Sequence, residues 1–223
     1  MKKPDDGKST DISQLHNIRT DYKKMELSEA EVDQDPIKQF ITWFNEALHS
    51  EVMEPNAMTL ATATADGQPN ARTVLLKHID DRGFVFFTNY DSKKGQEIAE
   101  NNKVSLLFFW PELERQVRIL GTAQKVSFEE SETYFHSRPR GSQLGALASH
   151  QSARIESRSV IEKKLAELEE QYKDSEIPLA DFWGGYCVKP LQLEFWQGGS
   201  NRLHDRIVYK YDTSKWEIFR ISP

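Results

Sequence analysis

The chain of 223 residues carries a formal net charge of −6 and contains a single cysteine, Cys187. An acidic balance disfavours non-specific binding to nucleic acid or to an anionic membrane surface, and one cysteine excludes an internal disulfide and any multi-thiolate metal site. With 38% hydrophobic and 29% charged residues, no apolar signal core at the start and no stretch near the roughly 20 apolar residues that span a bilayer, we expect a globular cytoplasmic protein.

The first predicted element is a helix that follows a polar arm. Residues 1–14 are mixed in charge, so we expect a flexible arm there, followed by one domain over residues 15–223. Between Pro36 and Val52 apolar residues recur at helical spacing, with Asp35 as N-cap and Pro36 in the first turn. This pattern predicts an amphipathic helix.

Short β-rich runs separated by turn signals come next. The runs 57–64, 70–79 and 84–88 are divided by Asp-Gly and Arg-Gly turns, which predicts three sequential antiparallel strands. We expect a polar helix over 92–102 and two further strands over 103–110 and 115–126. Five strands in a meander are enough to begin closing a barrel.

The rest of the chain contains two helical patterns and three more strands. Residues 128–139 are expected to form a short helix ended by Pro139, and residues 156–173 a longer one with Ile161, Leu165 and Leu168 on one face. Strands are expected over 191–197, 206–211 and 216–221. Because strands outnumber helices and do not alternate with them regularly, the pattern predicts a mainly β protein with flanking helices (α+β) rather than a doubly wound α/β fold.

Several familiar site motifs are absent from the sequence. It contains no glycine-rich phosphate loop, no dinucleotide fingerprint, no HExxH and no paired CxxC. The six histidines are scattered without metal-ligand spacing, so we expect no metal site. A phosphorylated ligand would therefore have to be held by side chains on strands and turns.

Three basic clusters are candidates for anion binding. In the first, strand alternation places Arg72 and Lys77 on opposite faces, where they can serve two different anions. The second lies at a strand end and helix start, where backbone N–H groups favour a phosphate, and contains Thr88, Ser92, Lys93 and Lys94. The third offers guanidinium forks and hydroxyl donors from Tyr134, Arg138, Arg140 and Ser142. Singly, each cluster is more often solvated surface; three of them among aromatic residues in an acidic chain favour anion binding.

A fourth cluster surrounds a Gly-Gly pair that lets the chain turn sharply. Its members fall within eleven positions and are Trp196, Gln197, Arg202, His204, Asp205 and Arg206. Packing alone gives little reason for this concentration, although a hydrogen-bonded structural role explains His204 equally well when it is taken by itself.

Together these blocks resemble the pyridoxine/pyridoxamine 5′-phosphate oxidases, an FMN-binding split-barrel family. The resemblance rests on RTVLLK, FFTNYDSKK, LERQVR, YFHSRPRGSQLGA, the Gln151-Ser152 pair, FWGGY, and EFWQGG followed by NRLHDR, and it runs from about Arg19 to Pro223. It implies a split β-barrel homodimer with FMN at the subunit interface. It also implies oxidation of pyridoxine 5′-phosphate and pyridoxamine 5′-phosphate to pyridoxal 5′-phosphate by hydride transfer from C4′ to flavin N5, with O2 as final acceptor giving H2O2.

The resemblance also assigns site residues. Cofactor contacts are implied for Arg72, Thr73, Val74, Leu75, Leu76, Lys77, Phe87, Thr88, Lys93, Lys94, Gln116, Gln151, Ser152, Trp196 and Arg206. Substrate contacts are implied for Arg19, Tyr22, Lys77, Tyr134, Arg138, Ser142, Arg202 and His204, with Arg202 and His204 as the catalytic pair. Residues 15–30 match a segment that folds over the site as a lid. The family usually has arginine at position 93, and Lys93 keeps the charge but loses the bidentate fork.

Two other functions are compatible with parts of the sequence. A split-barrel flavin reductase with another substrate needs neither the NRLHDR block nor the YFHSRPRGS cluster. A non-catalytic protein that binds flavin or pyridoxal phosphate needs the anion clusters but not Arg202 together with His204.

Overall fold

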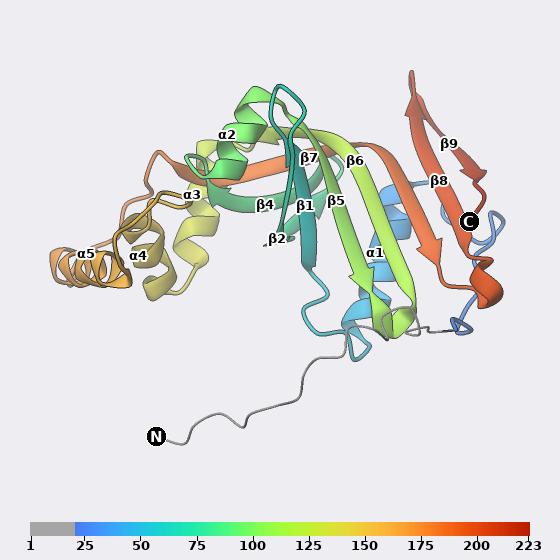
Figure 1. Ribbon diagram of the computed structural model, residues 1–223, viewed down its shortest axis with the longest axis horizontal. Helices are drawn as coiled ribbons and strands as arrows, with labels where there is room; N and C mark the ends of the chain where they lie inside the picture. Colours follow the sequence, from blue (N-terminus) through green and yellow to red (C-terminus); the bar gives the residue numbers. More distant parts are fainter. Residues whose placement is uncertain (1–20) are drawn as a thin grey trace.

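The protein, described by a computed structural model over residues 21–223, is built on one antiparallel sheet. The strand order is β2-β1-β5-β6-β7-β4-β3, and β8 and β9 extend the sheet from β7 (Figure 1). The strands are β1 (Ala57–Ala63), β2 (Pro69–Leu75), β3 (His78–Asp80), β4 (Gly83–Asn89), β5 (Lys103–Trp110), β6 (Arg115–Lys125), β7 (Trp183–Gln197), β8 (Asp205–Asp212) and β9 (Lys215–Arg220). The helices are α1 (Pro36–Leu48), α2 (Lys93–Glu100), α3 (Phe128–Ser137), α4 (Arg140–Ala148) and α5 (Arg158–Gln171).

The sheet curls until two of its strands that are distant in the strand order meet. β2 and β3 lie at opposite ends of that order, yet only Leu76 and Lys77 separate them in the chain. Such a link bridges at most about 11 Å, so the two strands must lie close together. The backbone N–H of Leu76 donates to the Asn56 carbonyl at 2.8 Å, and that of Lys77 to the Val85 carbonyl at 2.9 Å. The single strand predicted over 70–79 is therefore wrong, because the chain changes partners at this link.

β7 joins the two halves of the curled sheet. Its first half pairs with β4, its second half with β8, and both halves with β6. The register with β6 shifts between Leu120 and Gly121, where a Cβ on Gly121 would lie 2.4 Å from the Lys189 carbonyl oxygen. The predicted meander is corrected here, because β4 pairs with β3 and β7 instead of with β2, and because β7 begins at Trp183, well before the predicted start at 191.

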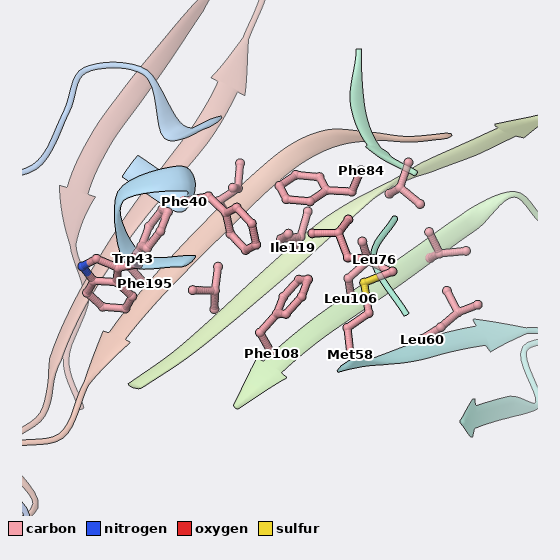
Figure 2. Close-up of a cluster of buried hydrophobic side chains, with 14 of the residues drawn as sticks. Phe40, Trp43, Met58, Leu60, Leu76, Phe84, Leu106, Phe108, Ile119 and Phe195 are labelled. Carbon is pink, nitrogen blue, oxygen red and sulfur yellow. The ribbon is translucent and has the colours of Figure 1, made fainter. Parts of the chain in front are cut away.

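A core of aromatic and aliphatic side chains fills the concave side of the sheet beneath α1 (Figure 2). Phe40 packs edge-on against Phe84 at 4.9 Å between ring centroids, and Trp43 packs edge-on against Phe195 at 5.2 Å. The predicted N-cap is confirmed, since the Asp35 side chain accepts a hydrogen bond from the Ile37 N–H. The helix ends at Leu48 rather than Val52, because the chain turns at Ser50, whose hydroxyl bonds the Ala47 carbonyl.

A second, smaller core joins α3, α4 and α5 at one end of the sheet (Figure 1). Leu168 is buried there with Ile161 and Leu165 packed beside it, which confirms the apolar face predicted for this helix. Helix α4 was not predicted, because Arg140, Gly141 and Ser142 suggest a loop. It provides one wall of the site described below.

Part of the predicted organisation stays a prediction. The arm over 1–14 and the first residues of the possible lid lie outside the described residues, as does Arg19. The single domain over 15–223 also stays a prediction. Within residues 21–223, no helix combines the length and the apolarity that crossing a membrane requires.

Candidate active site

A cavity of about 1000 Å³ opens where β2 faces α2, α3 and α4. Among the strands that the structure describes, β2 pairs with β1 alone, so its other edge has no strand partner and can meet a ligand. The cavity brings together most of the predicted contacts: Arg72, Thr73, Val74, Leu75, Lys77, Phe87, Thr88, Lys93, Lys94, Tyr134, Arg138, Ser142, Gln151 and Ser152. Arg72 and Lys77, which were expected on opposite faces of one strand, both line this cavity.

A buried lysine stands at the start of α2. Lys94 is 8% exposed, and its Nζ donates to the Ser92 hydroxyl at 3.2 Å and to Gln151 Oε1 at 2.8 Å. Ser92 is also the N-cap of this short helix. Burial lowers the pKa of Lys94, and the nearby charge of Arg72 lowers it further. A cation that is buried without a carboxylate directly on it favours an anionic ligand.

The Arg72 guanidinium is held in place by a buried carboxylate. Its NH2 nitrogen lies 3.1 Å from Glu97 Oε2, and its NH1 donates to the Thr62 hydroxyl at 2.5 Å. Glu97 is 2% exposed and also accepts from Asn70 at 3.2 Å. Burial raises the pKa of Glu97, but the hydrogen bonds from Thr62, Asn70 and Arg72 outweigh it, so the net pKa is lowered. Sequence reasoning missed Glu97, because a glutamate on a polar helix normally faces solvent.

Three aromatic side chains also line the cavity. Phe87 and Tyr134 stack with ring centroids 3.9 Å apart, and the Trp183 ring stacks nearly parallel to that of Phe87, with 5.7 Å between their centroids. Trp183 belongs to the FWGGY block of the sequence, but sequence reasoning did not predict it as a site residue.

Arg138 lies 4.7 Å over the Trp183 ring. Its NH1 nitrogen is buried with no hydrogen-bond partner among residues 21–223, and burial lowers the pKa of the guanidinium. An unpaired buried donor is costly, and an acceptor oxygen of a ligand in the cavity would satisfy it. The neighbouring Arg140 instead bonds the carbonyls of Tyr172 and Ser175 and does not line the cavity.

A second group of predicted residues lies away from the cavity, at the other end of β7. Trp196 and His204 pack at 4.6 Å between centroids, and Tyr22 contacts both, at 5.7 Å and 5.9 Å. The Gly199 N–H donates to His204 Nδ1 at 3.1 Å, so the neutral ring carries its proton on Nε2. Arg202 has a φ of 63°, a strained conformation for a residue other than glycine.

Arg206 belongs to the same end of β7 and is also held by a buried carboxylate. Its Nε lies 2.8 Å from Oε1 of Glu194, which is 2% exposed and pairs with Arg118 as well. Its NH1 donates to the Ser222 carbonyl at 2.9 Å. These contacts fix the direction of the guanidinium, and sequence reasoning did not single out Glu194.

Two further predicted cofactor contacts lie outside the cavity. Leu76 is 6% exposed and belongs to the main core, because it sits at the link between β2 and β3. Gln116 lies opposite Trp196 on β6. Among the described residues, no group of three or more histidine, cysteine, aspartate or glutamate side chains is placed to hold a metal ion.

Comparison with known proteins gives a consistent result over nearly the whole chain. A family model described as pyridoxamine 5′-phosphate oxidase matches residues 44–172, and one described as the pyridoxine 5′-phosphate oxidase C-terminal dimerisation region matches residues 183–223. The pyridoxine/pyridoxamine 5′-phosphate oxidases of Cyanothece sp. and Trichormus variabilis are 53% and 56% identical to it, and each alignment covers 94% of this chain and 98% of the relative.

Comparison with solved structures shows which known folds this chain resembles. PhzG of Burkholderia lata, in complex with tetrahydrophenazine-1-carboxylic acid, matches with a TM-score of 0.85 and 32% identity over 90% of this chain and 99% of that one. A pyridoxamine 5′-phosphate oxidase-related, FMN-binding protein of Nostoc punctiforme matches with a TM-score of 0.67 over 85% of this chain and 98% of that one. At 16% identity, the second likeness concerns the fold alone.

Proposed function

The chain belongs to the pyridoxine/pyridoxamine 5′-phosphate oxidase family, and from this premise we propose which of its residues hold the flavin and the substrate. It is an FMN-dependent enzyme that oxidises pyridoxine 5′-phosphate and pyridoxamine 5′-phosphate to pyridoxal 5′-phosphate on a split-barrel fold. Bound FMN would supply the acceptor for the hydride from the substrate C4′ carbon, with O2 as the final electron acceptor and H2O2 as its product.

The cavity has two cationic regions, and we assign one to each phosphate. Arg72 and Lys94, with the exposed Lys93 beside them, hold the phosphate of FMN; the buried position of Lys94 and the ion pair between Arg72 and Glu97 support this assignment. Thr88, Gln151 and Ser152 supply further polar contacts. The free edge of β2, from Thr73 to Leu75, is available for the ring system.

The substrate phosphate is assigned to Lys77, Tyr134, Arg138 and Ser142. The observation that carries this assignment is the buried NH1 of Arg138, which has no partner in the described structure and which a phosphate oxygen would satisfy. Holding the substrate by its phosphate fixes C4′ relative to the cofactor. Such positioning can lower a barrier by roughly 7–11 kcal/mol.

The protein is a homodimer, as its C-terminal dimerisation region implies, and we propose that each active site combines two subunits. Trp196, Arg202, His204 and Arg206 all lie within that region, and on a single chain they are separated from the cavity along β7. FMN at the subunit interface would allow Arg202 and His204 of the partner subunit to reach the substrate ring. Without the partner the cavity lacks the proposed catalytic pair.

The hydrogen bond to His204 defines what its ring can do. Because Nδ1 accepts from the Gly199 N–H, Nε2 carries the proton and presents a donor to the substrate. We therefore propose that His204 orients the pyridine ring together with Arg202 and that neither residue acts primarily as a base. The chain's residues then contribute mainly by positioning the substrate and by placing positive charge at the two phosphates.

The function is tested on the purified protein under air. We expect a flavin absorbance spectrum, and we expect hydrogen peroxide on addition of either pyridoxine 5′-phosphate or pyridoxamine 5′-phosphate. A yellow protein that releases no peroxide with either compound would contradict the proposed use of the site.

The shared site is tested by mixing two defective chains. Arg138→Met damages the cavity, and His204→Ala damages the other set, so a mixed dimer contains one site with both defects and one intact site. If subunits pair at random after co-expression with two different tags, about a quarter of the wild-type activity should return. Homodimers of each variant are the controls, and no recovery in isolated mixed dimers would show that each site is built from one chain.

A further inference from the structure

The segment that precedes α1, residues 21–35, runs along the same end of β7 and β8 as the proposed catalytic pair. We refer to these residues as the strap. Tyr22 lies near its start, half-buried against Trp196 and His204. The placement of Tyr22 therefore depends on how the neighbouring strap residues are fixed.

Glu114 fixes the strap directly beside Tyr22. Its Oε2 atom accepts hydrogen bonds from two successive backbone N–H groups, those of Lys23 at 2.9 Å and Lys24 at 3.0 Å. The residue is 7% exposed and has a φ of 55° and a ψ of 37°, the left-handed conformation that residues other than glycine and asparagine seldom adopt. A buried carboxylate in a strained backbone position that binds two main-chain donors is an organised anchor.

The backbone of Glu114 holds the other surface that Tyr22 contacts. Its carbonyl accepts from the Gly198 N–H at 2.7 Å and from the Gln197 side chain at 3.2 Å. A Cβ on Gly198 would lie 2.7 Å from Cγ of Tyr22, so the ring rests directly on this glycine. One residue therefore connects the strap through its side chain and the turn after β7 through its backbone.

The remainder of the strap has its own anchors, independent of Glu114. Asp205 accepts from the Leu27 N–H at 2.9 Å, and Arg220 donates to the Leu27 carbonyl at 2.8 Å and pairs with Glu29. The Tyr209 hydroxyl donates to the Asp33 carbonyl at 2.7 Å. Loss of the Glu114 carboxylate should therefore free the first residues of the strap while the later ones stay bound.

We infer that Glu114 is a positioning residue for substrate binding, because it holds Tyr22 against His204 by docking the strap at Lys23 and Lys24. The inference rests on the proposed role of His204 at the substrate ring. Glu114 touches neither substrate nor flavin in this assignment. Its removal should change the KM for the substrate far more than the retention of FMN.

Two variants and a matched control test the inference on the FMN-loaded enzyme. Glu114→Gly removes the carboxylate at a backbone conformation that glycine adopts freely, so it does not strain the fold. Glu114→Gln keeps the shape and one acceptor oxygen but loses the charge. Glu112→Gln is the control, because Glu112 is exposed and offers the strap its backbone carbonyl, not its carboxylate.

The first readout is tryptic cleavage after Lys23 and Lys24, followed by mass spectrometry. Both Glu114 variants should be cut there at least about tenfold faster than the wild type, and the control at the wild-type rate, since a charge-assisted hydrogen bond is worth a decade or more. Cleavage at the wild-type rate in both Glu114 variants would overturn the anchor. This readout needs no activity, so it stands even if the protein fails to oxidise pyridoxine 5′-phosphate, a result that would sink the proposed function instead.

The second readout separates positioning from general structure. The KM for pyridoxine 5′-phosphate should rise roughly tenfold in Glu114→Gly and less in Glu114→Gln, with flavin affinity within about twofold of wild type. Gly198→Ala, whose Cβ would lie 2.7 Å from Cγ of Tyr22 and so displace the ring, should raise KM similarly. Faster cleavage with unchanged KM would overturn the role in substrate binding, and release of FMN from both Glu114 variants would show that the residue supports the fold as a whole.

Discussion

Replacing Arg138 by methionine should change ligand binding and stability in opposite directions. The guanidinium lies over the Trp183 ring at 4.7 Å, and its NH1 nitrogen is buried without a partner in the described structure. Methionine keeps apolar contact with the ring and removes both the charge and the unpaired donor. The ligand-free protein should therefore gain stability while the phosphate loses its main partner.

The magnitudes follow from these contacts. An unsatisfied buried donor costs about 1–3 kcal/mol, and the lost cation–π contact offsets about 0.5–1 kcal/mol of that gain. The free energy of unfolding should rise by about 1 kcal/mol, which raises Tm by roughly 2–4 °C in a chain of this size. A charge-assisted hydrogen bond to phosphate contributes about 1.5–3 kcal/mol, so the KM for pyridoxine 5′-phosphate should increase roughly 10- to 150-fold.

Thermal unfolding of the ligand-free protein and steady-state peroxide release measure the two effects. Arg140→Met is the matched control, because Arg140 bonds the carbonyls of Tyr172 and Ser175 outside the cavity. Arg140→Met should have a lower Tm than the wild type and the same KM for pyridoxine 5′-phosphate. A lower Tm together with an unchanged KM for Arg138→Met would refute the assignment of the unpaired nitrogen to the substrate phosphate.

Three further predictions concern the other site residues. Arg72→Ala should weaken FMN binding, which flavin absorbance after gel filtration reports; full retention of the yellow colour would contradict its role at the flavin phosphate. The pKa of Lys94 lies below its ordinary 10.5, so FMN affinity should fall as pH rises through that lowered value. Over the range from the lowered pKa to about pH 10.5 the unfolded chain binds more protons than the folded one, so the stability of the FMN-free protein should rise with pH there. Lys94→Met should abolish both trends in fluorescence titrations and unfolding curves, and their persistence would exclude Lys94 as the cause. Arg202→Leu and His204→Ala should each reduce turnover while FMN stays bound, and full activity in both variants would remove this pair from the substrate site.

The fold could be predicted from the sequence wherever the signal was local. The helix at Pro36 has a cap and an apolar face within a few residues, and the strands from Ala57 to Trp110 are bounded by turns or by a helix. The pairing of β4 with β7 has no such signal, because the two strands are far apart in the chain and Gly184 and Gly185 weaken the strand pattern of β7. The change of partner at Leu76 was equally invisible, since a continuous β-rich run reads as one strand.

The cationic half of the candidate site could also be predicted, because arginine and lysine concentrate near turns in an acidic chain. Its supporting carboxylates could not. Glu97 and Glu194 lie on elements whose polar residues usually face water, and only the curled sheet buries them against Arg72 and Arg206. Arg140 carried the same sequence signal as Arg138, yet the start of α4 directs it towards backbone carbonyls.

The pairing of β4 with β7 also has a consequence for synthesis on the ribosome. Phe84 and its partner Val188 are separated by on the order of 100 residues, which take about 5–20 s to translate. During that time the apolar strand β4 has been synthesised, whereas β7, which pairs with one of its edges, has not. A nascent chain of this protein therefore exposes an aggregation-prone strand until its last quarter is made, and chaperones that shield such strands should increase its soluble yield.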